Sequence, residues 1–104
     1  MEPIRREIAT RYLDQFVTAI LTAGDTWTDP IQLLGDFALS ISGAWVGTIT
    51  LQWSFDGGAT WHDIERYTAN IADTGTGAAV GVLYRIGFRP GEYTSGAAVV
   101  RLAQ

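Results

Sequence analysis

The segment TITLQWSF (residues 48–55) decides the fold, because polar and apolar side chains alternate along it without interruption. This period of two predicts a β-strand with one face against a core. The tripeptide Asp56-Gly57-Gly58 follows, and its glycines can adopt the positive φ angles of a tight hairpin. Trp61–Thr68 is the expected partner strand, with a bulge where its alternation breaks at Asp63-Ile64.

Three further strands are expected before this hairpin. Asp36–Ser42 alternates in the same way, and Gly43 is expected to end it. Trp27–Leu34 predicts another strand, which Pro30 places at an edge or a bend because proline cannot donate to a ladder. Phe16–Leu21 is rich in residues that favour strands, so it is expected to be the first strand.

Two more strands are expected after the hairpin. Val80–Phe88 alternates and is followed by a turn at Pro90-Gly91, and Ala97–Leu102 closes the sheet. Asn70–Ala79 is small, glycine-rich and without alternation, which predicts a loop exposed to solvent or to a partner. Together the elements predict an all-β fold, a small antiparallel β-sandwich or barrel of about six to eight strands.

The chain is expected to divide into an N-terminal arm, residues 1–15, and one β-sandwich domain, residues 16–104. A length of 104 residues supports a single domain. Apolar residues recur at every fourth position from Ile4 to Ile20, which is typical of a helix, so the arm is expected to be extended or partly helical. Because the chain has no cysteine, oligomerisation or docking on a larger body is the expected source of additional stability.

Composition and charge exclude several functions. A net charge of −4 argues against a nucleic-acid partner, and no apolar run approaches the roughly 20 residues that cross a bilayer. His62 is the only histidine. Without cysteine it makes a zinc site improbable, and we interpret it as a solvated strand residue. No nucleophile, acid–base pair or phosphate-binding loop can be assembled, so the sequence predicts a protein that is not an enzyme and has no metal or cofactor.

The sequence SFDGGATW (residues 54–61) fits the pattern S-x-D-x-G-x-T-W, which resembles an Asp-box. In families that carry this motif, it forms a β-hairpin whose Asp and Ser/Thr side chains satisfy the turn backbone while Trp packs beneath. The resemblance implies a structural role for Ser54, Asp56, Gly58, Thr60 and Trp61. It implies no catalysis, because the motif occurs once and the chain is too short for the propellers that repeat it.

The four tryptophans raise the alternative of a glycan-binding module, since exposed aromatic rings stack on sugars. Trp53 lies on the apolar face of its strand and Trp61 belongs to the hairpin motif, so both are expected in the core. Trp27 and Trp45 lie in or beside turns and are the candidate exposed platforms. Core or interface packing is the competing interpretation of these aromatic residues.

From Gly43 onward the sequence resembles small virion proteins of tailed bacteriophages, a loose class of cysteine-free β-sandwich chains. The resemblance rests on three segments: GTITLQWSFDGGATW, GVLYRIG and GEYTSGAAVVRL. It implies a non-enzymatic structural protein located in the virion. It favours a capsid decoration (cement) protein on the head surface, often a homotrimer, with the major capsid protein or other virion proteins as partners. A neck, tail or baseplate protein is the alternative within the same class.

The N-terminal arm is the expected adhesive element of such a subunit. Three arginines in it could pair with acidic groups on the shell or on the next subunit, and its apolar residues could add buried area. The candidate interface residues are Ile4, Arg5, Arg6, Ile8, Arg11, Tyr12, Leu13 and Phe16.

Overall fold

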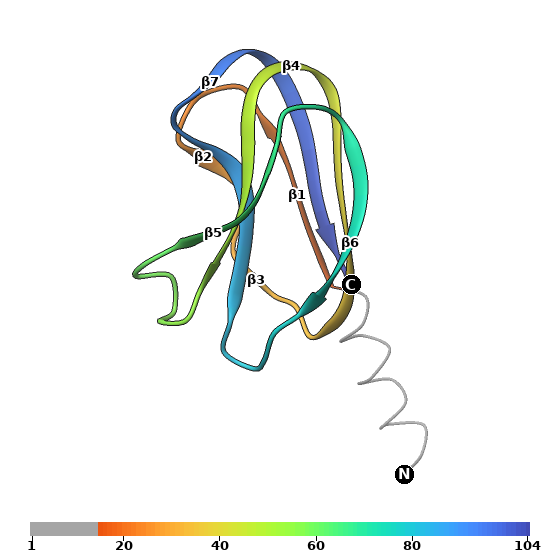
Figure 1. Ribbon diagram of the computed structural model, residues 1–104, viewed down its shortest axis with the longest axis vertical. Coiled ribbons are helices and arrows are strands. Elements are labelled where there is room, and N and C mark those ends of the chain that lie inside the picture. Colours follow the sequence, from red (N-terminus) through yellow and green to blue (C-terminus); the bar gives the residue numbers. More distant parts are fainter. Residues whose placement is uncertain (1–14) are drawn as a thin grey trace.

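Two long strands form the frame of the molecule. The computed structural model describes residues 15–104, and in it β4 (Gly35–Ser54) pairs antiparallel with β7 (Leu83–Ala103) over nearly its whole length. Both strands bend over at the same end of the molecule (Figure 1). Gly43 and Gly47 have φ angles of 100° and 147° at this bend. A Cβ atom at Gly43 would lie 2.5 Å from the carbonyl oxygen of Ala97, so the close approach of the two backbones requires glycine.

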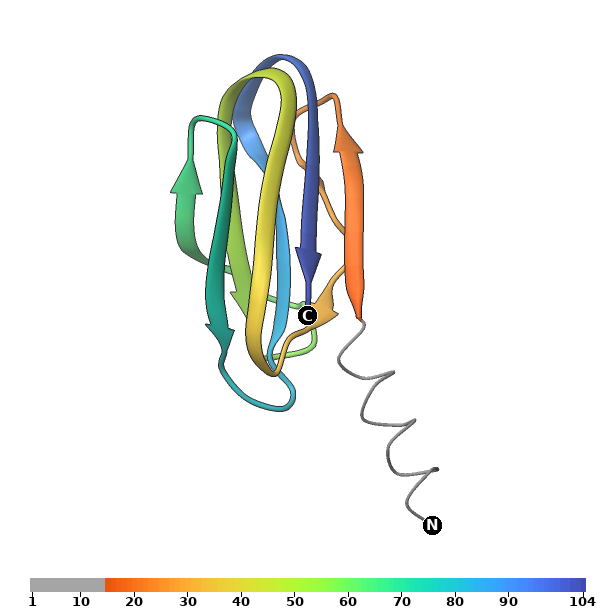
Figure 2. The same cartoon turned by 90° about the vertical axis from the view of Figure 1, so that its right-hand side faces the viewer.

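The bend folds this ribbon into the two layers of a sandwich (Figure 2). In the first layer, β1 (Phe16–Leu21) pairs with the last third of β7, and β6 (Ile71–Gly77) pairs with the first third of β4. In the second layer, β5 (His62–Tyr67) pairs with the end of β4, and β2 (Thr26–Trp27) and β3 (Ile31–Gln32) pair with the start of β7. The predicted all-β antiparallel fold is confirmed.

The core lies between the layers and is built from the alternating residues of the two long strands. Inward-facing positions of β4 and β7 are almost completely buried, as the period-two pattern requires. Residues from β1, β3 and the loops close the ends. The core comprises Leu21, Ile31, Leu33, Phe37, Leu39, Ile41, Ile49, Leu51, Val82, Tyr84, Ile86, Phe88, Ala98, Val100 and Leu102.

The prediction of a loop at Asn70–Ala79 is wrong, because Ile71–Gly77 forms strand β6 along the first third of β4. The segment lacks alternation because it is an edge strand with little to bury. Its glycines are required because neighbouring residues leave no room for a side chain, and not because the chain turns there. A Cβ atom at Gly75 would lie 2.8 Å from the Phe37 ring, and one at Gly77 would lie 2.0 Å from the carbonyl oxygen of Leu33.

Three predicted strand ends also differ from the structure. Gly43 does not end a strand, and the turn expected at Pro90-Gly91 lies inside β7, because both long strands bend and continue into the other layer. The strand expected at Trp27–Leu34 is divided into β2 and β3. The first strand has the predicted bounds, and the predicted bulge is present: Leu51 faces Glu65 and Gln52 faces Asp63, which leaves Ile64 without a partner.

No helix within residues 15–104 is long and apolar enough to cross a membrane. The expected N-terminal arm lies outside the described residues except for Gln15, whose carbonyl oxygen accepts a 2.8 Å hydrogen bond from the amide of Gln104.

Candidate functional site

The hairpin between β4 and β5 is held by its own side chains. The backbone amide of Gly58 donates to Ser54 Oγ (2.9 Å), and the amide of Thr60 donates to Asp56 Oδ1 (2.9 Å). Ser54 Oγ and Thr60 Oγ1 also donate to the Asp56 carboxylate. These hydrogen bonds from Thr60 and Ser54 lower the pKa of Asp56 from 3.8 to about 2. The hairpin geometry matches that expected of the motif, and each bond in it stays within the turn.

Trp61 packs beneath the turn, where a Cβ atom at Gly58 would lie 3.5 Å from its Cζ2, but the expectation that it belongs to the core is wrong. Its ring is half-buried and contacts the Arg85 guanidinium, with 4.3 Å between Cζ and the ring centroid. The Trp27 ring contacts the same guanidinium at 3.9 Å, and its indole nitrogen donates to Asp25 (3.1 Å). Burial lowers the pKa of Arg85, and the charge of Asp25 opposes this shift. The arginine thus joins two aromatic rings that are distant in sequence.

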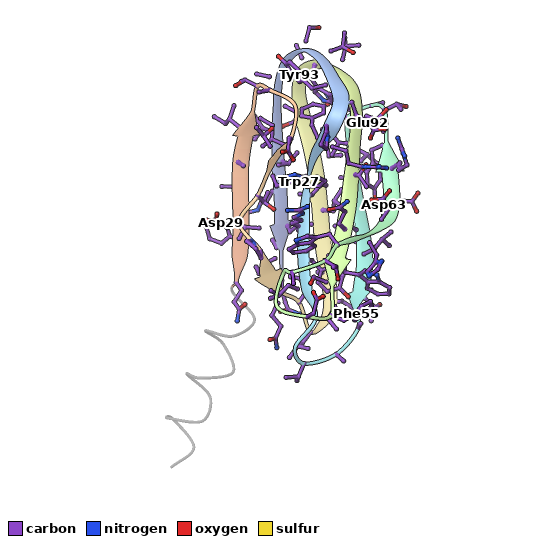
Figure 3. All side chains as sticks on the ribbon, turned by 90° about the vertical axis from the view of Figure 1, so that its left-hand side faces the viewer. Trp27, Asp29, Phe55, Asp63, Glu92 and Tyr93 are labelled. Carbon is purple, nitrogen blue, oxygen red and sulfur yellow. The ribbon has the colours of Figure 1, made fainter. Side chains whose placement is uncertain are left out.

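A chain of polar contacts continues from Arg85 across the second layer. Arg85 Nε donates to Gln52 Oε1 (2.9 Å), and Gln52 Nε2 donates to Asp63 Oδ1 (2.8 Å). Asp63 also forms an ion pair with Arg89 (2.8 Å). Figure 3 shows Trp27 near the middle of this surface, with Asp63 and Glu92 toward the β5 edge. We call this surface the charged face, and it comprises Trp27, Gln52, Trp61, Asp63, Arg66, Arg85, Arg89 and Glu92.

The outer surface of the first layer has a different chemistry. Ile20 is 71% exposed, Phe16 53% and Val99 38%. The first layer consists of β1, β6, the first third of β4 and the last third of β7. Among the outward-facing residues of these four segments, only Arg101 and Asp36 are charged. Arg101 lies over the Phe16 ring (4.3 Å). We call this surface, turned toward the viewer in Figure 2, the neutral face. It comprises Phe16, Thr18, Ile20, Ala38, Ser40, Ser42, Ala72, Thr74, Thr76 and Val99.

A third feature is a groove where the two layers part. Strands β5 and β6 both pair with β4 but belong to opposite layers, and the space between them leads to the core. Its cavity volume is about 180 Å³. Aromatic rings from Phe37, Trp53 and Tyr84 line it together with Ile64, which is 40% exposed. We call this space the β5–β6 groove. Its floor is apolar and made of the sandwich core itself.

The rim of the β5–β6 groove is acidic. Glu65 from β5 and Asp73 from β6 lie on opposite sides of it, and the Tyr67 hydroxyl donates to Asp73 Oδ2 (3.4 Å). Burial raises the pKa of Tyr67 to about 12, and the charges of Asp73 and Glu65 add to this shift. The tyrosine therefore reports a negative potential at the rim.

The candidate glycan platforms are both engaged within the chain. One ring face of Trp27 is covered by Arg85, as described above. Trp45 packs against the core with its ring 5.8 Å from Phe88, and its indole nitrogen donates to Asn70 Oδ1 (2.7 Å).

Of the candidate interface residues, Phe16 lies at the start of β1 on the neutral face. The other seven lie outside the described residues: Ile4, Arg5, Arg6, Ile8, Arg11, Tyr12 and Leu13.

His62 lies exposed on β5 with its ring 6.0 Å from that of Phe55. Within residues 15–104 no three His, Asp or Glu side chains gather as metal ligands would. The features that stand out are surfaces and a groove, which suit binding to another macromolecule.

The chain matches no protein-family model, no curated protein and no solved structure. The geometry and the sequence therefore carry the functional argument. Sequence reasoning missed Arg85 and the β5–β6 groove. The sequence around Arg85 shows the ordinary alternation of polar and apolar residues in a strand. No spacing along the sequence links Arg85 to Trp27 or Trp61. The groove depends on β6, which the sequence pattern hides.

Proposed function

We propose that this protein is a non-enzymatic structural component of a tailed-bacteriophage virion, a decoration protein that stabilises the head shell. The proposal combines the sequence resemblance with one structural observation. That observation is the neutral face, a sheet surface with exposed Phe16 and Ile20 and almost no charge. Depletion of charged residues together with exposed apolar side chains is typical of the centre of a protein interface.

The neutral face is the proposed contact with the major capsid protein. Four strands spaced about 4.8 Å apart, each about seven residues long, give a face of roughly 400 Å². A specific interface buries about 800 Å² on each partner, so the face supplies about half of the required area. An oligomer joined through the N-terminal segments of its subunits would supply the rest, because each copy adds its own neutral face. The proposed attachment is therefore arm-assisted and oligomeric, with a trimer favoured.

The internal construction supports a structural role. Because β4 and β7 each run through both layers, the two layers share their central strands and move as one body. On the charged face, Arg85, Gln52 and Asp63 form a chain of hydrogen bonds. These features leave the neutral face and the groove as the surfaces available for assembly.

The proposal is tested by binding of the purified chain to phage heads that lack it, followed by sedimentation. We expect saturable co-sedimentation with heads and none with isolated tails. Ser42→Arg places a long cation in the neutral face and should reduce head binding at least about tenfold, because an unpaired buried charge is costly. Ser95→Arg is the matched control, because Ser95 is exposed near the bend of β7 and should tolerate the same change.

Two results would contradict the proposal. Binding to tails rather than heads would place the protein in the neck, tail or baseplate. Absence of the chain from purified particles, measured by peptide mass spectrometry, would remove the virion role altogether.

A further inference from the structure

We propose that the β5–β6 groove of one copy receives the N-terminal segment, residues 1–14, of a second copy. This inference rests on the proposed function and deepens it, since a decoration protein of this size needs contacts between its own copies. It names the surface of the protein that would bind this segment, in which arginines and apolar residues alternate in short runs.

The floor of the groove suits an apolar side chain. The cavity of about 180 Å³ is lined by Phe37, Trp53 and Tyr84, whose rings pack on one another at 5.6 and 6.1 Å. An apolar cavity of about 150 Å³ is large enough for benzene. The groove therefore has room for one large side chain, and the N-terminal segment offers Ile4 and Ile8.

The rim of the groove suits the charges of the same segment. Glu65 and Asp73 face each other across the opening, and neither forms an ion pair within residues 15–104. In an extended segment Arg6 shares a side with Ile4, so seating Ile4 in the cavity would bring the Arg6 guanidinium to the acidic rim. Arginine pairs well with carboxylates at interfaces because its planar fork donates two parallel hydrogen bonds.

Strand β6 adds a backbone contact. It pairs with β4 on one side only, over Gly35–Ile41, so the amides and carbonyls of its other side lack a ladder partner within the described sheet. Exposed edges are usually protected by charged side chains, proline or a bulge, and β6 has no proline and no bulge, with Asp73 as its one charged residue. An extended segment can therefore add to β6 while its side chains enter the groove.

The direction of the chain favours a second copy over the same molecule. The hydrogen bond between the Gln104 amide and the Gln15 carbonyl continues the β1–β7 ladder to the last residue before the segment. The chain at Gln15 thus still follows the strand direction, away from the sheet. Strands β5 and β6, which flank the groove, lie at the opposite edge of the sandwich from β1 (Figure 2). The groove and the start of the segment therefore lie at opposite edges of one molecule, which favours the groove of a second copy.

The test uses the absence of cysteine from the full chain. Ile4→Cys and Ile64→Cys are combined in one chain, which is mildly oxidised and analysed by mass under denaturing conditions. Disulfides form only when the two Cα atoms lie within about 7 Å. We expect covalently linked dimers and larger species, at about ten times the yield of the control. The control pairs Ile4→Cys with Ile20→Cys, whose side chain is 71% exposed on β1 at the other edge.

Each possible result either supports or overturns the docking of the N-terminal segment in the groove of a second copy. A linked chain of monomer mass would show that the segment occupies its own groove and would overturn the assignment to a second copy. Equal yields with Ile64→Cys and Ile20→Cys would overturn the groove as the acceptor. Asp73→Cys, whose side chain lies on the groove side of β6, replaces Ile64→Cys if that variant folds poorly.

This experiment is independent of the head-binding test. Links through the groove without head binding would refute the proposed function alone. Head binding without links would refute the docked segment alone.

Discussion

The neutral face and the charged face are built on the same two strands, yet they treat their outward residues in opposite ways. In the second layer, outward-facing Gln52 and Ser54 of β4 are buried beneath the side chains that hydrogen-bond to them. In the first layer, Ala38 and Ser42 of the same strand are exposed. One face is thus covered by the chain's own long side chains and the other is bare. The difference supports the proposal that the neutral face is the one that binds a partner.

The removal of Arg85 should have the largest effect on stability and should show the difference between the two faces most clearly. Arg85→Ala deletes two ring contacts and leaves Gln52 Oε1 without its donor, so we expect a loss of about 2–3 kcal/mol in the free energy of unfolding. Arg101→Ala is the matched control on the neutral face, where a single ring contact with Phe16 is exposed. It should cost about 0.5 kcal/mol. Urea denaturation of both variants measures the difference, and equal losses would remove the contrast.

The hairpin that adjoins the charged face should give the next largest effect. The pKa of Asp56 is about 2 in the folded state against 3.8 for the free carboxyl, so folding favours the ionised form. Its contribution is present above about pH 4 and is lost as the pH falls toward 2. Asp56→Asn should therefore be less stable than the parent at pH 7, with the gap closing between pH 4 and 2. A gap that stays constant over this range would contradict the hydrogen-bonded carboxylate.

The ion pair at the border of the charged face should contribute less. Arg89 and Asp63 are each more than a third exposed, so Arg89→Ala should cost about 0.5 kcal/mol at low salt and less at high salt. Thermal unfolding at two salt concentrations checks this. A loss that does not depend on salt would mean that the pair stabilises the fold through packing rather than charge.

The smallest change in stability is expected on the neutral face. Ser42→Arg should alter the free energy of unfolding by less than about 0.5 kcal/mol, because the side chain is exposed. Light scattering should still show an assembled chain, since the groove is untouched, while head binding is lost. A large loss of stability would mean that this face belongs to the fold and not to an interface.

Local alternation was enough to predict the all-β class and most of the core. The inward positions of Phe37–Ile41, Ile49–Leu51 and Tyr84–Phe88 followed directly from it. The continuity of β4 was missed because Gly43 normally ends a strand, whereas here it lets two backbones approach. Strand β6 was missed because its glycines are required by close contacts with Phe37 and Leu33, which lie far away in the sequence.

The candidate sites were less accessible to prediction than the fold. The hairpin motif could be located because its bonds are local, between residues at most four apart. The Arg85 stack and the β5–β6 groove join residues from separate strands. Such contacts are fixed by sheet register and have no signature along the chain. The arm residues proposed for docking remain a prediction, and the disulfide test addresses them directly.

The position of β7 has a consequence for how the protein is made. Strand β7 is central in both layers and follows the other six described strands in the chain. While the ribosome is still translating it, β1, β2 and β3 have no partner in the sheet, because all three pair with β7. Neither layer can close early, so folding must follow release of this strand and depends on contacts between distant parts of the chain, which form slowly. Until then the apolar strand β4 is exposed, and rapid capture by a chaperone would be most useful in that interval.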